Sequence, residues 1–272
     1  MSDQVSTQVT AILVVHDGAT WLPKVVAAIA SQSRAPDRTI AVDTGSIDGS
    51  SKLLTSARIK HLTLSRGEGF GSAVSEAVAT LPPCESEDEW IWLLHDDSAP
   101  DHRALEKLLA AVGDRPNIAM VGPKILGWNN RSHLLEVGIS IARNGARWTG
   151  LEVDEFDQGQ HDGVFEVLSV STAGALIRRS VFEELGGFDE KLDLFRDDVD
   201  FGWRVHTAGQ SVLVTTDAVL YHAEAAASER RTVDVDEAFL HRPLLLDRRN
   251  AAYVLLTNST WWMLPLLSLI HI

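Results

Sequence analysis

The sequence contains a single cysteine, Cys84, among its 272 residues, so no disulfide bond can form within the chain. A chain without disulfides is compatible with a reducing compartment. Positive charge is also scarce, because 24 lysines and arginines face 38 aspartates and glutamates, which gives a net charge of −14. Binding to nucleic acid normally requires a basic surface, so we expect no nucleic-acid partner.

The two ends of the sequence differ in character. The first residues lack the basic region and apolar core of a secretory signal peptide, and they predict none. Residues 253–272 contain no Asp, Glu, Lys or Arg, and about 20 apolar residues can span a bilayer. Trp261 and Trp262 suit a membrane interface, and Arg248 and Arg249 precede the segment as a cytoplasmic flank would. We therefore expect residues 253–272 to contact a membrane, as the start of a membrane region; the alternative is a core helix.

Apolar runs alternate with helical patterns over the first 123 residues. Strands are predicted at 9–15, 39–42, 61–64, 90–94 and 118–121, and helices at 21–32, around 53–54, at 71–79 and at 101–112. Alternation of this kind predicts a mostly parallel sheet with right-handed crossovers. An α/β fold class follows.

The pattern becomes mixed after Pro123. Asn144-Gly145 predicts a hairpin between strands at 134–142 and 147–153. Further strands are predicted at 165–171, 175–178, 211–215 and 218–221, with a helix at 199–208 and a short helix begun by a capping box at 180–183. No stretch has the composition of a flexible linker, so we predict one domain over residues 1–252, with halves of about 1–123 and 124–252.

One stretch combines a buried strand with metal-competent side chains. Residues 90–100 have the sequence WIWLLHDDSAP, which places His95, Asp96 and Asp97 at the carboxyl end of a strand, where open α/β sheets bind ligands. Two adjacent carboxylates repel each other unless a cation lies beside them, and Mg²⁺ is commonly held by one or two carboxylates plus phosphates. The alternative is a solvated acidic turn that caps the helix from Asp101.

Other polar residues follow strands or open helices. Asp43 stands where a carboxylate often binds a nucleotide, or it belongs to an Asx turn in the sequence DTGSIDGS. Asp197 and Asp198 open a helix, whose dipole favours the ionised form that a general base needs; the alternative is plain N-capping, which we expect for one of the two. His222 ends a strand; it either packs in the structure or joins Asp97 in a mixed metal site.

Two further features are weaker signals. The stretch around Gly69, with the sequence GEGFG, departs from the dinucleotide-binding pattern, and it favours close backbone approach to a ligand or to a neighbouring element. Trp203 lies on the predicted helix at 199–208, where an aromatic residue normally belongs to the core.

Seven stretches in sequence order carry a resemblance to a known family: AILVVHDGATWLPKVVAAIASQS, AVDTGSIDGS, RGEGFGSAVSEAV, WLLHDDSAP, STAGALIRRSVFEELGGFDE, FRDDVDFGWRVHTAGQ and VLYHAEA. From Val9 to about Tyr253, the chain resembles the family-2 glycosyltransferases of the GT-A fold, particularly the bacterial rhamnosyl- and galactofuranosyl-transferase-like branch. The resemblance implies a mostly parallel sheet flanked by helices, with a nucleotide-binding first half and an acceptor-binding second half. It also implies an inverting transfer of a sugar from a nucleotide-diphosphate donor to an acceptor hydroxyl, with Mg²⁺ or Mn²⁺ as cofactor.

The resemblance assigns roles to individual residues. Asp43 resembles the aspartate that contacts the base or ribose, and Asp96 the one that contacts the ribose or donor sugar. Asp97 resembles the metal-binding end of a D-x-D motif, His222 an additional metal ligand, and Asp198 the general base. His16 and Gly69 are expected near the donor.

Secondary roles are expected for Asp197, Trp203, Arg204 and His95, the last of which replaces the first aspartate of the D-x-D motif. The polar stretch 152–163 is expected to border the acceptor site. In the branch that the chain resembles, a hydrophobic C-terminal region after an RN-x-x-Y-like stretch, here 249–253, often meets the membrane. The resemblance thus implies a membrane-associated enzyme on the cytoplasmic face, acting on a saccharide or lipid-linked saccharide in cell-envelope polysaccharide or glycolipid synthesis.

Two other functions compete with this one. A nucleotidyltransferase would use a similar sheet and a metal-bound carboxylate, but the early loop HDGATWLP has no basic residue for a triphosphate. A non-catalytic binding module with the same fold is the second alternative, because His95 departs from the motif; metal-dependent hydrolysis of a donor would exclude it.

Overall fold

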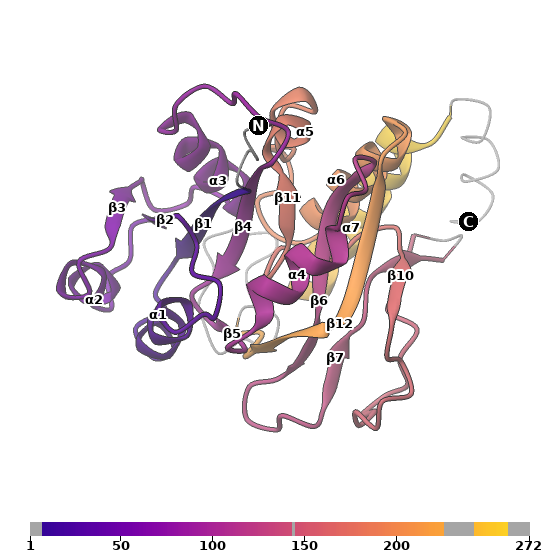
Figure 1. Cartoon of the computed structure of the whole chain (residues 1–272). Helices are drawn as coiled ribbons and strands as arrows, with labels where there is room; N and C mark the ends of the chain where they lie inside the picture. Colours follow the sequence, from indigo (N-terminus) through magenta and orange to yellow (C-terminus); the bar gives the residue numbers. More distant parts are fainter. Residues whose placement is uncertain (1–6, 143–144, 226–241, 261–272) are drawn as a thin grey trace, which may run out of the picture.

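A large twisted sheet with helices on both faces forms the centre of the computed structural model, which describes residues 7–142, 145–225 and 242–260 (Figure 1). The strands are β1 (Gln8–Val15), β2 (Arg38–Asp43), β3 (Lys60–Thr63), β4 (Glu89–His95), β5 (Ser98–Pro100), β6 (Ile118–Gly127), β7 (Leu134–Glu136), β8 (Ser140–Ile141), β9 (Arg147–Trp148), β10 (Val164–Glu166), β11 (Leu176–Arg178) and β12 (Ser211–His222). The helices are α1 (Leu22–Ala30), α2 (Ser50–Ser56), α3 (Phe70–Ala79), α4 (Ala104–Val112), α5 (Arg179–Glu184), α6 (Asp197–Thr207) and α7 (Pro243–Asn258).

The strand order is β10-β12-β6-β11-β4-β1-β2-β3, with β5 paired to β12 and β7 paired to β6. Strands β1 to β4 are parallel, and β12 is parallel to β6. Strand β11 lies antiparallel between β4 and β6, so β6 and β12 run in the same direction as β1 to β4. The carboxyl ends of β1, β2, β4, β6 and β12 therefore meet along one edge of the sheet, as the alternating sequence pattern predicts.

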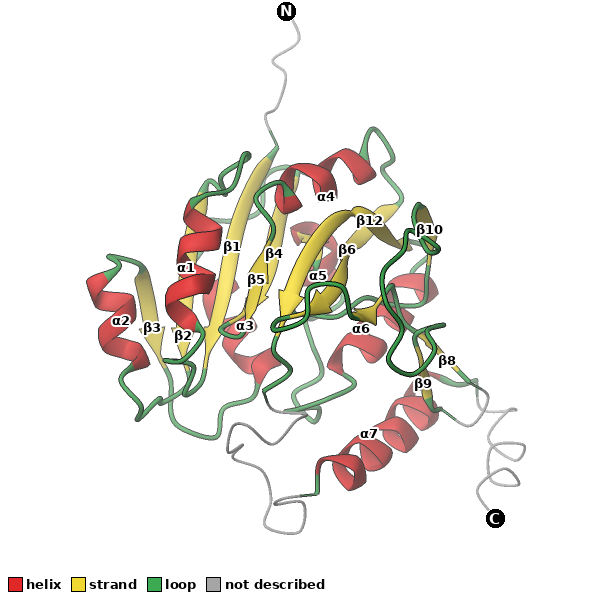
Figure 2. Ribbon diagram, turned by 90° about the horizontal axis from the view of Figure 1, so that it is seen from below, coloured by secondary structure: helices red, strands yellow, loops and turns green. Residues whose placement is uncertain are grey.

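Side chains of the central strands alternate between two hydrophobic clusters, because successive residues of a strand point to opposite faces. In β1, Val9, Ala11 and Leu13 join the cluster that includes α1 and α4, whereas Ile12 and Val14 join the cluster that includes α3, α5 and α6. Figure 2 shows these helices on the two sides of the sheet. Burial on both faces explains the continuous apolar runs of the sequence.

Strand β12 corrects a sequence prediction. Two short strands are predicted over 211–215 and 218–221, but one strand runs through Ser211–His222 with a register shift between Thr215 and Val219. The irregularity lets the second part of the strand pair with both β6 and β5. His222 is thereby paired with Ser98, three residues beyond His95.

The second half contains shorter strands than the sequence predicts. The hairpin is present, since β8 pairs with β9 across Gly145, whose φ is +76°; Asn144 lies outside the described residues. The predicted capping box is wrong: α5 begins at Arg179, and the Ser180 hydroxyl donates to Glu87 instead of the backbone. The predicted division at residue 123 falls within β6.

Helix α7 packs on α6 and crosses residue 253, where an apolar segment is predicted to begin. Val254 of α7 and Val199 of α6 share a small hydrophobic cluster. No helix within the described ranges is both long and apolar enough to cross a membrane. Residues 261–272, including both predicted interface tryptophans, lie outside those ranges.

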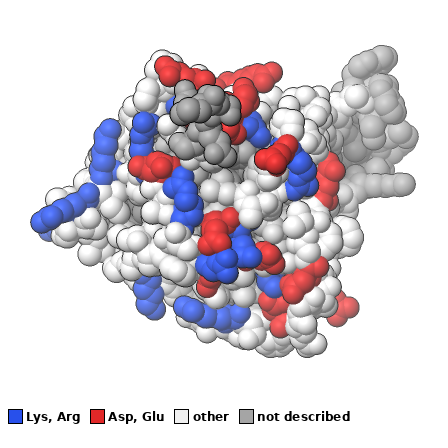
Figure 3. Space-filling view, in the orientation of Figure 1, with Lys and Arg blue, Asp and Glu red and all other residues white. Residues whose placement is uncertain are grey.

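The surface in Figure 3 shows Lys and Arg side chains interspersed with Asp and Glu. Lys124, in contrast to these surface side chains, is buried, and it forms ion pairs with Asp157 at 2.7 Å and Asp162 at 3.0 Å. These pairs attach the polar stretch 152–163 to β6. No residue of that stretch lines the cavity described below, and its position beside an acceptor stays a prediction.

Candidate active site

A cavity of about 580 Å³ opens at the shared carboxyl edge of the sheet. Its walls come from the ends of β1, β4 and β12, the start of α3, the hairpin strand β9, the loop before α6, and the first turns of α7. Ligands of open α/β sheets bind at this edge. The charged residues of the described lining are Glu68, Asp96, Asp97, Glu136, Arg147, Asp193, Arg196, Asp197, Asp198, Glu224 and Asp247.

Acidic groups dominate this lining, with nine carboxylates against two guanidinium groups among the described residues. Carboxylates that share a cavity destabilise one another unless cations or protons balance them. A diphosphate would add further negative charge. The cavity therefore suits an anionic ligand only when a cation enters with it.

Three side chains in the cavity can hold a divalent cation. Ligand atoms of His95, Asp97 and His222 all lie within 4.8 Å of one another, and this is the one such cluster within the described ranges. The Nε2 of His222 lies 3.2 Å from Oδ1 of Asp97. Imidazole and carboxylate groups are both common ligands of divalent metals, so this donor set fits the predicted cofactor.

Asp97 is buried and held in place on its other side. Its Oδ2 accepts a hydrogen bond of 2.8 Å from the backbone N–H of Ala225, and its carbonyl accepts one of 3.0 Å from Ala223. Burial opposes protonation of His222, but the neighbouring Asp97 carboxylate outweighs this effect and raises the pKa of the imidazole. The Asp97 carboxylate thus favours a positive charge beside it.

Asp96 points away from this cluster, towards the end of β1. Its Oδ2 accepts a hydrogen bond of 2.7 Å from the backbone N–H of His16, and only 1% of the residue is exposed. Gly18 packs directly on the same carboxylate, since a Cβ at that position would lie 2.2 Å from Oδ2. The two adjacent carboxylates therefore face different parts of the cavity.

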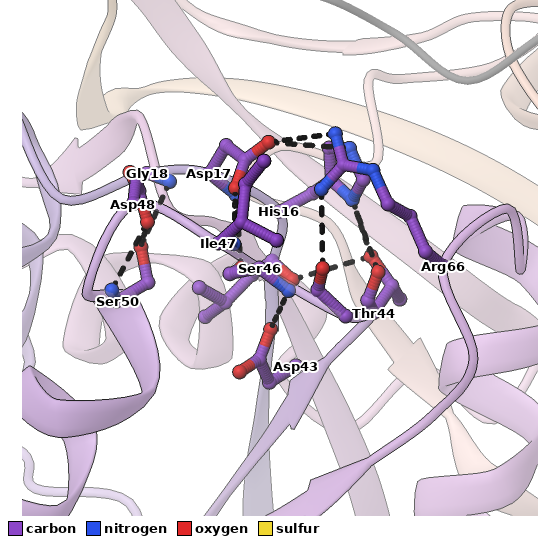
Figure 4. A network of polar contacts seen from close by, with 12 residues as sticks. His16, Asp17, Gly18, Asp43, Thr44, Ser46, Ile47, Asp48, Ser50 and Arg66 are labelled. Atoms are coloured by element: carbon purple, nitrogen blue, oxygen red, sulfur yellow. Dashed lines mark hydrogen bonds and ion pairs between the residues drawn. The ribbon is translucent and has the colours of Figure 1, made fainter.

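The loops after β1 and β2 are tied together by side chains (Figure 4). Asp17 accepts hydrogen bonds from the Ile47 N–H at 2.8 Å and from Arg66 at 2.8 Å. His16 and Thr44 line the cavity and are joined by a contact of 2.8 Å between Nδ1 and Oγ1. Asp43 does not line it; its Oδ1 accepts a hydrogen bond of 2.9 Å from the backbone N–H of Ser46, three residues on, and so stabilises the turn that follows β2.

Asp198 lies in the cavity wall at the first turn of α6. Its Oδ2 forms an ion pair of 3.1 Å with Arg147, and its Oδ1 accepts a hydrogen bond of 2.7 Å from the Val199 N–H. Arg147 also pairs with Glu136, which accepts a hydrogen bond from Ser171. Burial raises the pKa of Glu136, and Arg147 opposes that rise. The base candidate is thus oriented by a charged network from β7 and β9.

The neighbouring Asp197 has an altered acidity. Burial, followed by repulsion from Asp198, raises the pKa of Asp197 to about 7. The folded protein therefore retains a proton on Asp197 between about pH 4 and pH 7 that the unfolded chain has already lost. The stability that this group contributes falls as the pH rises through that window.

Replacing Asp197 by Asn is expected to remove this loss of stability. The free energy of unfolding of the variant should exceed that of wild type by more at pH 8 than at pH 5. We expect this difference to increase by roughly 1–3 kcal/mol between the two pH values. Urea unfolding at several pH values measures the effect, with Asp114→Asn on the surface as the control. An advantage that is independent of pH would show that Asp197 is ionised throughout.

The loop before α6 has an unusual backbone that α7 supports. Phe195 and Arg196 have φ values of +65° and +71°, which non-glycine residues rarely adopt. The buried Arg196 guanidinium binds both oxygens of Asp247, at 2.6 and 2.7 Å, and donates to the Gly145 carbonyl at 3.0 Å. Helix α7 and the β8–β9 hairpin thus fix the backbone that leads into Asp197 and Asp198.

Asn250 of α7 completes this support, because its Nδ2 donates to the carbonyls of Leu194 at 2.7 Å and Phe195 at 3.1 Å. Replacing Asn250 by Ala is expected to lower the free energy of unfolding by roughly 1–3 kcal/mol, since two carbonyls lose their partner. Thermal or urea unfolding measures this. Asn117→Ala, which removes only an exposed 3.5 Å contact with Ser211, is the control and should change little. Equal effects of the two variants would contradict the supporting role.

Three other predicted site residues have clear positions. Gly69 lines the cavity at the start of α3, and a Cβ there would lie 2.8 Å from the backbone of Asp193. Trp203 and Arg204 lie outside the cavity lining, so any part they take in the site is indirect. Trp203 packs in the cluster beneath α7, and Arg204 binds Asp200 and the carbonyls of Leu185 and Gly187.

Several residues of the cavity were not predicted from the sequence, among them Glu136, Arg147, Thr172 and Arg196. Arg147 and Glu136 stand in short strands without a motif, and only the hairpin brings them to Asp198. The one sequence signal was the Asn-Gly turn, which places Arg147 on a returning strand. Thr172 approaches His95 through a tertiary contact of 3.1 Å.

Comparison with known proteins adds evolutionary evidence. The family model described as "Glycosyltransferase like family 2" matches residues 8–235. The chain is 26% identical over 266 residues to N-acetylglucosaminyl-diphospho-decaprenol L-rhamnosyltransferase of Mycobacterium tuberculosis, covering 88% of this chain and 82% of that protein. It is 25% identical over 203 residues to a galactofuranosyltransferase of Mycolicibacterium smegmatis, covering 74% of this chain and 66% of that protein.

Solved structures share the fold. The mannosyltransferase PcManGT of Pyrobaculum calidifontis, solved with GDP-Man and Mn²⁺, superposes with a TM-score of 0.59 and 15% identity, over 97% of this chain and 79% of that one. GalNAc-T7, solved with UDP, GalNAc and Mn²⁺, gives a TM-score of 0.64 and 16% identity, over 81% of this chain and 44% of that one. The GT-A fold expected from the sequence is confirmed.

Proposed function

Because the chain belongs to the family-2 glycosyltransferases, we propose that it transfers a sugar, with inversion, from a nucleotide-diphosphate donor to an acceptor hydroxyl. The observation that carries the proposal is that one cavity contains both a cation-binding cluster and a separate oriented carboxylate. His95, Asp97 and His222 form the cluster, and Asp198 lies in the same cavity on α6.

The donor would bind at the carboxyl ends of β1, β2 and β4. Asp96, which faces the end of β1, would contact the ribose or the donor sugar, and His16 borders the same space. Asp43 would contact the base or ribose by exchanging part of its turn hydrogen bonding for the ligand. Gly69 would lie beside the donor at the start of α3, where the absence of a side chain permits close packing against the backbone of Asp193.

The diphosphate would bind beside His95, Asp97 and His222 together with Mg²⁺ or Mn²⁺. A divalent cation held there would neutralise the charge that develops on the leaving diphosphate. Two neighbours of the same fold were solved with Mn²⁺, which supports this cofactor. The acidic lining supports it independently, because the diphosphate would otherwise be repelled.

Asp198 would act as the general base. It would accept the proton of the acceptor hydroxyl as that oxygen attacks the anomeric carbon from the face opposite the diphosphate. Arg147 orients one oxygen of Asp198, and the Val199 N–H orients the other. No group of the protein needs to form a bond to the sugar, so a single displacement inverts the anomeric centre.

The acceptor would be a saccharide or a lipid-linked saccharide of the cell envelope. The name of the similar rhamnosyltransferase includes a decaprenol diphosphate acceptor, which supports a lipid-linked substrate for this chain. An enzyme acting on such a lipid would work at the cytoplasmic face of the membrane, with residues 253–272 in contact with it. The first turns of α7 line the cavity, which supports an acceptor that reaches the site past this helix.

Product analysis tests the proposed reaction. The protein is incubated with UDP-, GDP- and dTDP-sugars, with Mn²⁺ or with EDTA, and the nucleotides are separated by chromatography. Transfer to an acceptor or to water breaks the bond between sugar and diphosphate, so one nucleoside diphosphate should accumulate only with the cation. Release of a nucleoside monophosphate would instead indicate cleavage between the phosphates, which is nucleotidyltransferase-type chemistry and would overturn the proposal.

A further inference from the structure

The cation cluster offers two imidazoles and only one carboxylate. We infer that this donor set makes the site selective for a transition-metal ion such as Mn²⁺ over Mg²⁺, and that His95 determines the selectivity. The inference rests on the proposed function for its biological meaning. The metal preference itself is a property of the protein that can be measured without donor or acceptor.

The chemistry of the ligands sets the direction of the preference. Mg²⁺ is a hard ion that binds oxygen ligands, keeps several waters and is usually held by carboxylates and phosphates. Imidazole nitrogen favours first-row transition metals, whose affinity for a given site rises from Mn²⁺ towards Cu²⁺. His95 and His222 supply two nitrogens in a cluster of three side chains. Two nitrogen ligands therefore raise the affinity of the site for Mn²⁺, Fe²⁺ or Co²⁺ above its affinity for Mg²⁺.

A second carboxylate does not restore an oxygen-rich site. Asp96 is adjacent in sequence, but its Oδ2 binds the His16 N–H at 2.7 Å and packs against Gly18. Within the described ranges, the groups that can share one ion are His95, Asp97 and His222. The divergence of Asp96 and Asp97 thus leaves Asp97 as the anionic ligand.

His95 is held as a ligand rather than left to rotate. Its ring packs against Phe70 with centroids 4.7 Å apart, and it meets the edge of the His222 ring at 5.5 Å. Its Nε2 lies 3.1 Å from the Thr172 hydroxyl, a contact of the kind that orients metal-binding histidines. An orientation fixed in advance lowers the cost of binding the ion.

The net charge of the metal-loaded cluster also affects how strongly the diphosphate of the donor binds. One carboxylate beside a divalent ion leaves a net charge of about +1 at the cluster, because both histidines bind metal in the neutral form. A site of two carboxylates would leave about zero. The His95 site therefore attracts a diphosphate more strongly, in a cavity whose other walls are acidic.

Metal binding to the donor-free, full-length protein tests the inference. Mn²⁺ is titrated and bound ion is followed by electron paramagnetic resonance, with Mg²⁺ as competitor, and spin-echo modulation reports directly coordinated nitrogen. We expect wild type to prefer Mn²⁺ over Mg²⁺ by roughly 100-fold, with modulation from two nitrogens. The His95→Asp variant should reduce the preference for Mn²⁺ over Mg²⁺ by roughly tenfold or more. Its spin-echo modulation should come from one nitrogen instead of two.

Two variants control for unfolding and for charge. His95→Asn removes the imidazole without adding charge, so it should weaken Mn²⁺ binding and leave Mg²⁺ binding no stronger. His61→Asp makes the same charge change on β3, outside the cavity, and should leave both affinities unchanged. Circular dichroism establishes that each variant is folded.

The outcomes separate this inference from the proposed function. Equal affinity of wild type for Mn²⁺ and Mg²⁺, or an unchanged preference in His95→Asp, overturns the inference. If either ion then supports release of nucleoside diphosphate, the proposed function stands without it. If wild type binds neither ion and no nucleotide, both fail.

Discussion

Replacing Asp97 by Asn is expected to lower the rate of nucleoside diphosphate release from the donor by roughly 100- to 1,000-fold or more. Asp97 is the only anionic member of the cation cluster, and its Oδ1 lies 3.2 Å from His222. Without its charge, the cluster holds a divalent ion poorly and the acidic cavity repels the diphosphate. The steady-state rate with the preferred donor at saturating Mn²⁺ measures the effect.

The asparagine is chosen to keep the local structure. Its amide oxygen can still accept the hydrogen bond from Ala225 that Oδ2 of Asp97 accepts at 2.8 Å. Unfolding should therefore change little, and direct titration should show weaker Mn²⁺ binding. Asp114→Asn, an exposed aspartate outside the cavity, provides the matched control. Wild-type activity in the Asp97 variant would eliminate the cluster as the catalytic metal site.

The second large effect is expected for Asp198. Asp198→Asn should lower kcat by roughly 100- to 10,000-fold, the range that a general base contributes, while KM for the donor stays within a few fold. The amide preserves the contact with the Val199 N–H but cannot accept a proton from the acceptor. Arg147 keeps Glu136 as its partner, so the hairpin should remain in place. Steady-state kinetics with a competent acceptor measures both constants.

Asp197→Asn distinguishes the two adjacent carboxylates. Burial and Asp198 raise the pKa of Asp197 to about 7, so below pH 7 this group is mostly protonated and a neutral amide resembles it. We expect this variant to keep activity within about tenfold of wild type. If Asp197→Asn abolished kcat and Asp198→Asn did not, the role of base would pass to Asp197.

The strands and the metal-competent edge could be predicted because they depend on local pattern. Apolar runs such as 90–94 identify strands buried on both faces, and parallel strands bring the residues after them to one edge. This reasoning placed Asp96, Asp97 and His222 at the cavity. It also identified the Asp197-Asp198 pair at a helix start, and α6 begins at Asp197.

The remaining features depend on contacts between segments distant in sequence. The orientation of Asp96 towards His16 is set by Gly18, and it could not be inferred from two adjacent aspartates. Arg147 reaches Asp198 only because a hairpin folds back over α6. Trp203 and Arg204 were expected in the site because they follow the base, but the helical period turns them towards α7 and towards the end of α5.

The contacts of helix α7 with the loop before α6 could not be predicted from the sequence either. The predicted apolar segment begins only at Tyr253, within α7, whereas Asp247 and Asn250 earlier in the same helix hold the loop that precedes the base. The polar stretch Asp247-Arg248-Arg249-Asn250 does not show in the sequence which residues it binds. The structure supplies that partner in Leu194, Phe195 and Arg196, which adopt their conformation against α7.

Calorimetric titration of UDP, GDP and dTDP, each with and without Mn²⁺, tests most directly whether a cation holds a nucleoside diphosphate in this cavity. One nucleotide should bind to wild type only when Mn²⁺ is present, and Asp97→Asn should lose that binding while Asp114→Asn keeps it. Binding of a nucleotide with equal affinity in EDTA, or to the Asp97 variant as tightly as to wild type, would contradict the account.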